Sequence, residues 1–181
     1  MRLPIYFLLA LFFSMPAGAQ LTVEQLQGVT VSATTLIHVR MRRAGQEFEN
    51  QDRWEIEFRI GPGGVINASY RHAVSRDGNH IASDDGDFSE TIGKPGLFKG
   101  MQSLWLLQGN SLLRLIAYST GGSRTIFTFY PTEGGLKCSV ERANALEVGK
   151  GNSRVPSMAD GYPIEILSTR QVSSNCRATR E

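Results

Sequence analysis

The sequence predicts an all-β protein built as an antiparallel meander, and we expect it to form an up-and-down β-barrel of about eight strands with a short N-terminal helix. Apolar and polar residues alternate with period two in segment after segment, as they do in half-buried strands. These segments recur about every ten residues, are joined by tight turns, and have no crossover helix between them. Closure into a barrel would remove both exposed sheet edges.

The first 19 residues resemble an export signal. Arg2 precedes an apolar run over 5–13, and the small residues at 17–19 form a signal-peptidase pattern, so we expect cleavage near Ala19. The apolar run is about half the ~20 residues that a membrane-spanning helix needs, so we expect no membrane span in the mature chain. Residues 20–181 would then be a single β-barrel domain in the periplasm or outside the cell.

The elements follow in order from the mature end. Thr22 and Gln25 have the spacing of a capping box, which predicts a short helix over 22–27, and Gly28 ends it. The segment 98–108 also has apolar residues at helical spacing, but the hairpin signal Gly109-Asn110 directly after it favours a strand. Strands are expected at 31–42, 52–60, 65–74, 88–92, 103–108, 112–120, 124–130, 136–144 and 164–172.

The two cysteines, Cys138 and Cys176, are expected to form a structural disulfide. Their number is even, and an exported chain meets oxidising conditions. The alternatives are a redox pair or half of a metal site, but the cysteines lack C-x-x-C spacing and have no histidine nearby.

The sequence shows no catalytic, metal or cofactor motif. The three histidines lack metal-ligand spacing, and neither a serine nucleophile elbow nor a phosphate-binding loop is complete. Asp84, Asp85 and Asp87 are weak candidates for a calcium site, but we favour a solvated loop whose Asp and Gly residues make turns. Without the first 19 residues the chain has 18 basic and 17 acidic residues, which gives no reason to expect a nucleic-acid partner.

Two apolar features suggest binding surfaces. If the barrel has a pocket, its inward candidates are Trp54, Phe58, Phe127 and Phe129, although the same rings would equally fill a solid core. The hairpin 104–118 is apolar on both pleat faces, so both faces need a cover. That cover is the N-terminal helix, the segment 147–163, or a partner subunit.

These features favour a non-catalytic exported binding or interaction module, with a small apolar ligand or an envelope protein as partner. The alternative is an envelope structural or assembly protein that uses the 104–118 hairpin as an interface. A hydrolase-type enzyme is less favoured, because no constellation of catalytic residues is present.

The C-terminal third resembles a group of small uncharacterised exported proteins of soil α-proteobacteria. The resemblance lies in Gly121-Gly122-Ser123-Arg124, Lys137-Cys138-Ser139-Val140, Glu165-Ile166-Leu167-Ser168 and Val172-Ser173-Ser174-Asn175-Cys176. It implies a bacterial periplasmic or secreted protein with its two cysteines bonded, and it implies no catalytic residue. The likeness to lipocalins is one of architecture, because the Gly-x-Trp expected at the first strand is absent here.

Overall fold

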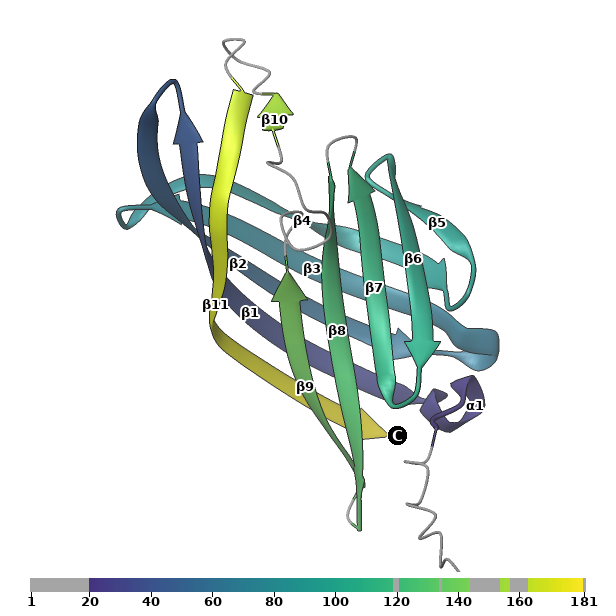
Figure 1. The fold of residues 1–181 in the computed structure, drawn as a ribbon. Helices are drawn as coiled ribbons and strands as arrows, with labels where there is room; N and C mark the ends of the chain where they lie inside the picture. Colours follow the sequence, from purple (N-terminus) through teal and green to yellow (C-terminus); the bar gives the residue numbers. More distant parts are fainter. Residues whose placement is uncertain (1–19, 119–120, 134, 144–153, 157–162, 181) are drawn as a thin grey trace, which may run out of the picture.

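The computed structural model describes residues 20–118, 121–133, 135–143, 154–156 and 163–180, which form two antiparallel sheets and one short helix (Figure 1). The helix is α1 (Val23–Leu26), and a 3₁₀ turn, η1 (Pro62–Gly64), links two strands. The first sheet, sheet A, contains β1 (Val29–Arg43), β2 (Gln46–Ile60), β3 (Val65–Arg76), β4 (Asn79–Thr91), β10 (Arg154–Pro156) and β11 (Pro163–Arg180). The second, sheet B, contains β5 (Pro95–Phe98), β6 (Met101–Gln108), β7 (Ser111–Tyr118), β8 (Gly121–Thr132) and β9 (Gly135–Ala143).

The antiparallel all-β class is confirmed, and the order of strands is a meander. Sheet A runs β10-β11-β1-β2-β3-β4, and sheet B runs β5-β6-β7-β8-β9. Within the described part of the chain, the hydrogen-bonded ladders form these two sheets, and no closed barrel is found. The two sheets lie face to face and cross at a large angle in Figure 1.

The helix and the ambiguous segment behave as predicted. Thr22 Oγ1 accepts a hydrogen bond from the Gln25 amide, and Gln25 Oε1 accepts one from the Thr22 amide, so the capping box is complete. The segment 98–108 is extended rather than helical, and β6 joins β7 through the Gly109-Asn110 turn. The strand count is higher than expected because β5 and β10 are short and begin or end at proline, which hides a strand signal.

The expectation of a solvated loop at 83–87 is wrong, since these residues lie inside β4. They pair in register with β3, where Asp85 lies opposite Arg71 and Asp84 lies opposite His72. Cross-strand partners of this kind stabilise a strand whose own residues favour turns. β4 is also an edge strand, where charged residues are common because they discourage pairing with other chains.

The core lies between the facing sheets and follows the predicted alternation. In β2, Ile56, Phe58 and Ile60 are at most 3% exposed. α1 contributes Leu26, which is fully buried, and Leu21 before it donates to the carbonyl of Gly109 at 3.0 Å. The helix therefore sits at one end of the sandwich, beside the turn between β6 and β7. Other fully buried side chains are Val29, Val31, Ile66, Trp105, Leu112, Phe127 and Phe129.

Candidate functional site

The aromatic pocket candidates mostly belong to a filled core. The Phe58 ring lies 5.0 Å from the Phe127 ring and 5.3 Å from the Trp105 ring, measured between centroids. Phe58, Phe127 and Phe129 are at most 1% exposed. Trp54 lies further along the sandwich, partly buried and stacked on Tyr70 at 5.0 Å. A ligand among the three phenylalanines would have to separate rings that already pack together, so their role in binding stays a prediction.

The acidic candidates point to different faces of β4. Asp84 lies on the inner face, where its carboxylate accepts hydrogen bonds from Lys99 and from the Tyr70 hydroxyl. The hydrogen bond from Lys99 is the main reason that the pKa of Asp84 is lowered. Asp85 and Asp87 alternate with it and are exposed on the outer face. Among the described residues, no three His, Cys, Asp or Glu side chains gather in a way that could hold a metal ion.

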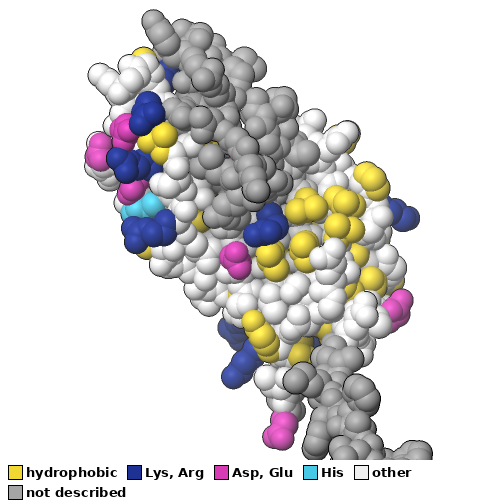
Figure 2. Space-filling view, viewed as in Figure 1, with side chains coloured by type: hydrophobic (Ala, Val, Ile, Leu, Met, Phe, Trp, Pro, Cys, Tyr) yellow, Lys and Arg dark blue, Asp and Glu magenta, His cyan; other side chains and the backbone are white. Residues whose placement is uncertain are grey.

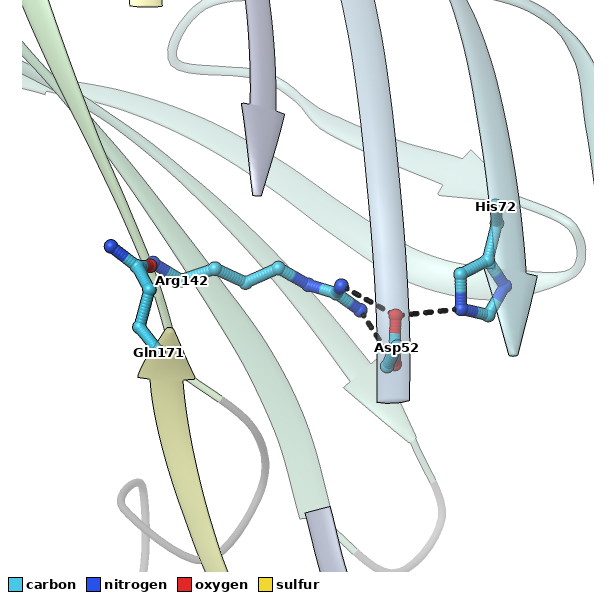
Figure 3. Close-up of polar contacts among 4 residues, drawn as sticks. All are labelled: Asp52, His72, Arg142 and Gln171. Carbon is cyan, nitrogen blue, oxygen red and sulfur yellow. Dashed lines mark hydrogen bonds and ion pairs between the residues drawn. The ribbon is translucent and has the colours of Figure 1, made fainter. Parts of the chain in front are cut away.

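A polar cluster joins the two sheets near one end of the sandwich (Figure 3). Asp52 from β2 and His72 from β3 lie on the inner face of sheet A, and Arg142 reaches them from β9 of sheet B. Arg142 donates from Nη1 to Asp52 Oδ1 at 2.8 Å and from Nη2 to Oδ2 at 3.3 Å. His72 Nε2 lies 2.9 Å from Asp52 Oδ1, and it donates because a carboxylate only accepts.

The environment of Asp52 favours its ionised form. Burial raises the pKa of Asp52, but the hydrogen bond from His72 and the positive charge of Arg142 together lower it by more. The pKa therefore lies below the ordinary value for an aspartate. The side chains of Asp52 and Arg142 are only 13% and 10% exposed, so water screens their attraction weakly.

Gln171 of β11 holds the neighbouring edge of β9. Its Oε1 accepts from the backbone amide of Arg142 at 2.8 Å, and its Nε2 donates to the carbonyl of Val140 at 3.3 Å. The side-chain amide thus takes the place of a ladder partner where sheets A and B meet. It reaches this position at a bulge, where the β1–β11 register shifts between Leu36 and Ile37 and leaves Val172 as the extra residue.

The predicted disulfide is present at the same junction. Cys138 of β9 and Cys176 of β11 are bonded, with their Cα atoms 5.4 Å apart. We call this junction of β9 and β11 the seam. In the part of the chain that the structure describes, the two strands belong to different hydrogen-bonded ladders. The seam is held instead by the disulfide, by the Gln171 amide and by the Asp52–Arg142 ion pair.

The chemistry of the polar cluster is that of a cross-link. An aspartate that orients a histidine is one part of a nucleophilic triad, but such a triad also needs a hydroxyl or thiol bonded to the histidine. Within the described ranges, His72 has its hydrogen bond to Asp52 and no hydroxyl or thiol bonded to it, and both cysteines are in the disulfide. The cluster therefore joins β2 and β3 to β9.

A second buried polar group ties the opposite edges of the sheets together. Glu90 at the end of β4 accepts hydrogen bonds from the Ser103 hydroxyl and the Trp105 indole of β6. Arg114 Nε lies 3.7 Å from Glu90 Oε2, and its guanidinium lies over the ring of Phe88 at 4.1 Å. The side chains of Glu90 and Arg114 are only 3% and 2% exposed, so this pair belongs to the core.

The outer face of sheet B carries a continuous apolar surface, which we call the outer apolar face. Trp105 and Arg114, which point inward, alternate with leucines that point outward. Leu97 is 70% exposed, and a shallow groove of about 730 Å³ runs between it and Leu104. Figure 2 shows hydrophobic side chains gathered on this face, with charged residues at the margins. The outer apolar face comprises Pro95, Leu97, Leu104, Leu106, Leu113, Leu115 and Ile126.

The predicted cover of this face is answered in part. α1 lies at the end of the sandwich with Leu26 in the core, so the helix does not cover the outer apolar face. Most of the second candidate cover, 147–163, lies outside the described residues, as does the predicted signal at 1–19.

Sequence reasoning found the disulfide and the doubly apolar hairpin but missed the polar cluster. Asp52 and Arg142 are 90 positions apart, and neither belongs to a motif. Their meeting depends on how the two sheets face each other.

Comparison with known proteins adds no relative. No protein-family model, curated protein or solved structure matches the chain. None of the described helices has the length and apolar character needed to span a membrane.

Proposed function

We propose that this chain is an exported, non-catalytic interaction module that binds another polypeptide through the outer apolar face. The observation that carries this proposal is the contrast between the two outer faces of the sandwich. On sheet B the outward side chains of β6 and β7 are leucines, whereas outward positions of β2 in sheet A are Arg53, Glu55, Glu57 and Arg59.

An exposed aliphatic face gives nothing to the folding of an isolated chain. Apolar surface stabilises a protein when it leaves water, by about 25 cal/mol per Å². Exposed apolar patches of a few hundred Å² on soluble proteins commonly mark interaction sites. A covering polypeptide would bury the Leu97 side chain and the groove beside it.

Export is part of the proposal. The disulfide between Cys138 and Cys176 is compatible with an oxidising compartment, where such bonds persist. We propose that cleavage near Ala19 releases the mature chain there. A lipocalin-like barrel of about eight strands remains a further proposal, because side chains rather than a ladder join β9 to β11.

Site-specific photo-crosslinking in intact cells tests the proposed interaction. A photo-reactive phenylalanine in place of Leu113 lies on the outer apolar face, and the same residue in place of Ser69 lies on the exposed outer face of sheet A. We expect the protein with the probe at 113 to form a discrete protein–protein crosslink and the protein with the probe at 69 to form none. Absence of a crosslink at 113, or equal labelling at both positions, would remove the outer apolar face as the binding surface.

A further inference from the structure

We propose that the partner of the outer apolar face is a second copy of this chain, bound face to face about a two-fold axis. This inference rests on the proposed function, since it names the partner for the same surface. In the resulting dimer, sheet B of one copy would pack on sheet B of the other, as sheets pack inside a β-sandwich at a spacing of about 10 Å.

The chemistry of the face favours a copy of itself. Leu104 lies opposite Leu115, and Leu106 lies opposite Leu113, so the centre is aliphatic on neighbouring strands. Ile126 continues the surface onto β8. Such a centre offers no charge and no side-chain hydrogen bond that would select a foreign partner, whereas aliphatic surface packs well on an identical aliphatic surface. A two-fold contact of this kind is isologous, with the same patch used by both copies.

The charges at the margin allow two identical faces to meet. Arg124 of β8 and Glu141 of β9 lie beside the aliphatic centre, and their charged atoms are 4.0 Å apart. Because this pair is neutral as a whole, a second copy brings no net like charge against the first. Sheet A lacks this property, since an identical copy would place the acidic Asp85 and Asp87 of β4 near charges of the same kind.

The size of the face predicts a weak dimer. Four strands spaced by ~4.8 Å and about five residues with a rise of ~3.3 Å give a flat area of roughly 300 Å². A stable interface buries about 800 Å² on each partner, so the margin must contribute and the contact falls in the weak, reversible class. We therefore expect dimers at about 100 µM and monomers at about 1 µM.

Sedimentation equilibrium of the mature chain with its disulfide intact tests this directly. We expect the average mass to rise towards twice the chain mass over that concentration range. The variants Leu104→Lys and Leu113→Lys should weaken association by at least about tenfold, because each places a charge in the contact. Ser69→Lys, on the outer face of sheet A, is the matched control and should associate like the unmodified protein.

Two outcomes would overturn the inference: an unmodified protein that stays monomeric at every concentration, or a control variant that loses association as fully as the two leucine variants. Circular dichroism and a thiol count on each variant establish that it is folded and oxidised. The crosslinked product from position 113 separates this inference from the proposed function. A product of twice the chain mass supports the second copy, whereas a product with a different protein leaves an interaction module and refutes self-association.

Discussion

Replacing Arg142 by Met would cut the ion pair that links β9 to β2 while keeping a side chain of similar length. The pair consists of two hydrogen bonds, at 2.8 and 3.3 Å, between side chains that are 10% and 13% exposed. Exposed pairs contribute about 0–1 kcal/mol, whereas breaking a fully buried pair costs about 3–5 kcal/mol. Because the exposure here is small but not zero, we expect Arg142→Met to lower the free energy of unfolding by about 3 kcal/mol at neutral pH.

The loss should depend on pH in a definite direction. The folded-state pKa of Asp52 is lowered, so its ionised form stabilises the protein above the unfolded-state value of about 3.9, and this stabilisation is lost as the pH falls through the folded-state pKa. Without Arg142 the burial of Asp52 is opposed by His72 alone, so ionisation contributes less. The difference in stability between the two proteins should therefore be largest near neutrality and should narrow below about pH 4.

Urea unfolding followed by circular dichroism, at neutral pH and near pH 3.5, measures both effects. Asp52→Asn and the double variant complete a cycle that isolates the pairwise energy. Arg40→Met is the control, because Arg40 pairs with Glu47 while its side chain is 58% exposed, and its loss should be much smaller. A loss below about 1 kcal/mol for Arg142→Met, or an equal loss at both pH values, would refute the view that this pair holds the seam.

Three further substitutions test other parts of the fold by the same unfolding measurement. Replacing Cys138 and Cys176 together by Ser should cost about 4 kcal/mol, because the bond closes a loop with a sequence separation of 38, and a loss below about 1 kcal/mol would contradict this. Gly64→Ala should be clearly more destabilising than Gly45→Ala, although both glycines have positive φ, because only at 64 would the added Cβ come within 2.9 Å of the N-terminal helix; equal losses would show that this close approach is relieved. Glu90→Gln should cost about 3 kcal/mol because it leaves a buried guanidinium facing a neutral amide, and an unchanged midpoint would argue against a buried ion pair.

Local patterns predicted those elements whose stability is itself local. The helix follows from Thr22 and Gln25, which satisfy each other's backbone, and β2 follows from strict alternation at 54–60. β4 was misjudged because aspartate and glycine favour turns when considered alone. Its partners on β3, among them Arg71 opposite Asp85, lie outside any local window.

The polar cluster could not be predicted from the sequence for a related reason. Asp52 and His72 are on neighbouring strands, but the register that aligns them and the crossing of the sheets that brings in Arg142 are tertiary properties. Gln171 depends in addition on a bulge in β11. The cysteines were predictable because a disulfide needs only two thiols and an oxidising compartment, whereas an ion pair has many candidate partners along the chain.

The two polar links and the outer apolar face together separate stability from interaction in this protein. The core, the disulfide and the Asp52–Arg142 and Glu90–Arg114 pairs all act between the sheets, so they hold the sandwich together whatever covers its outside. The outer apolar face lies on the other side of sheet B and contributes to none of these contacts. Threonine would serve there equally well as a strand former, with a polar group for water. The leucines of β6 and β7 are therefore best explained by a surface that is buried only when another polypeptide packs against it.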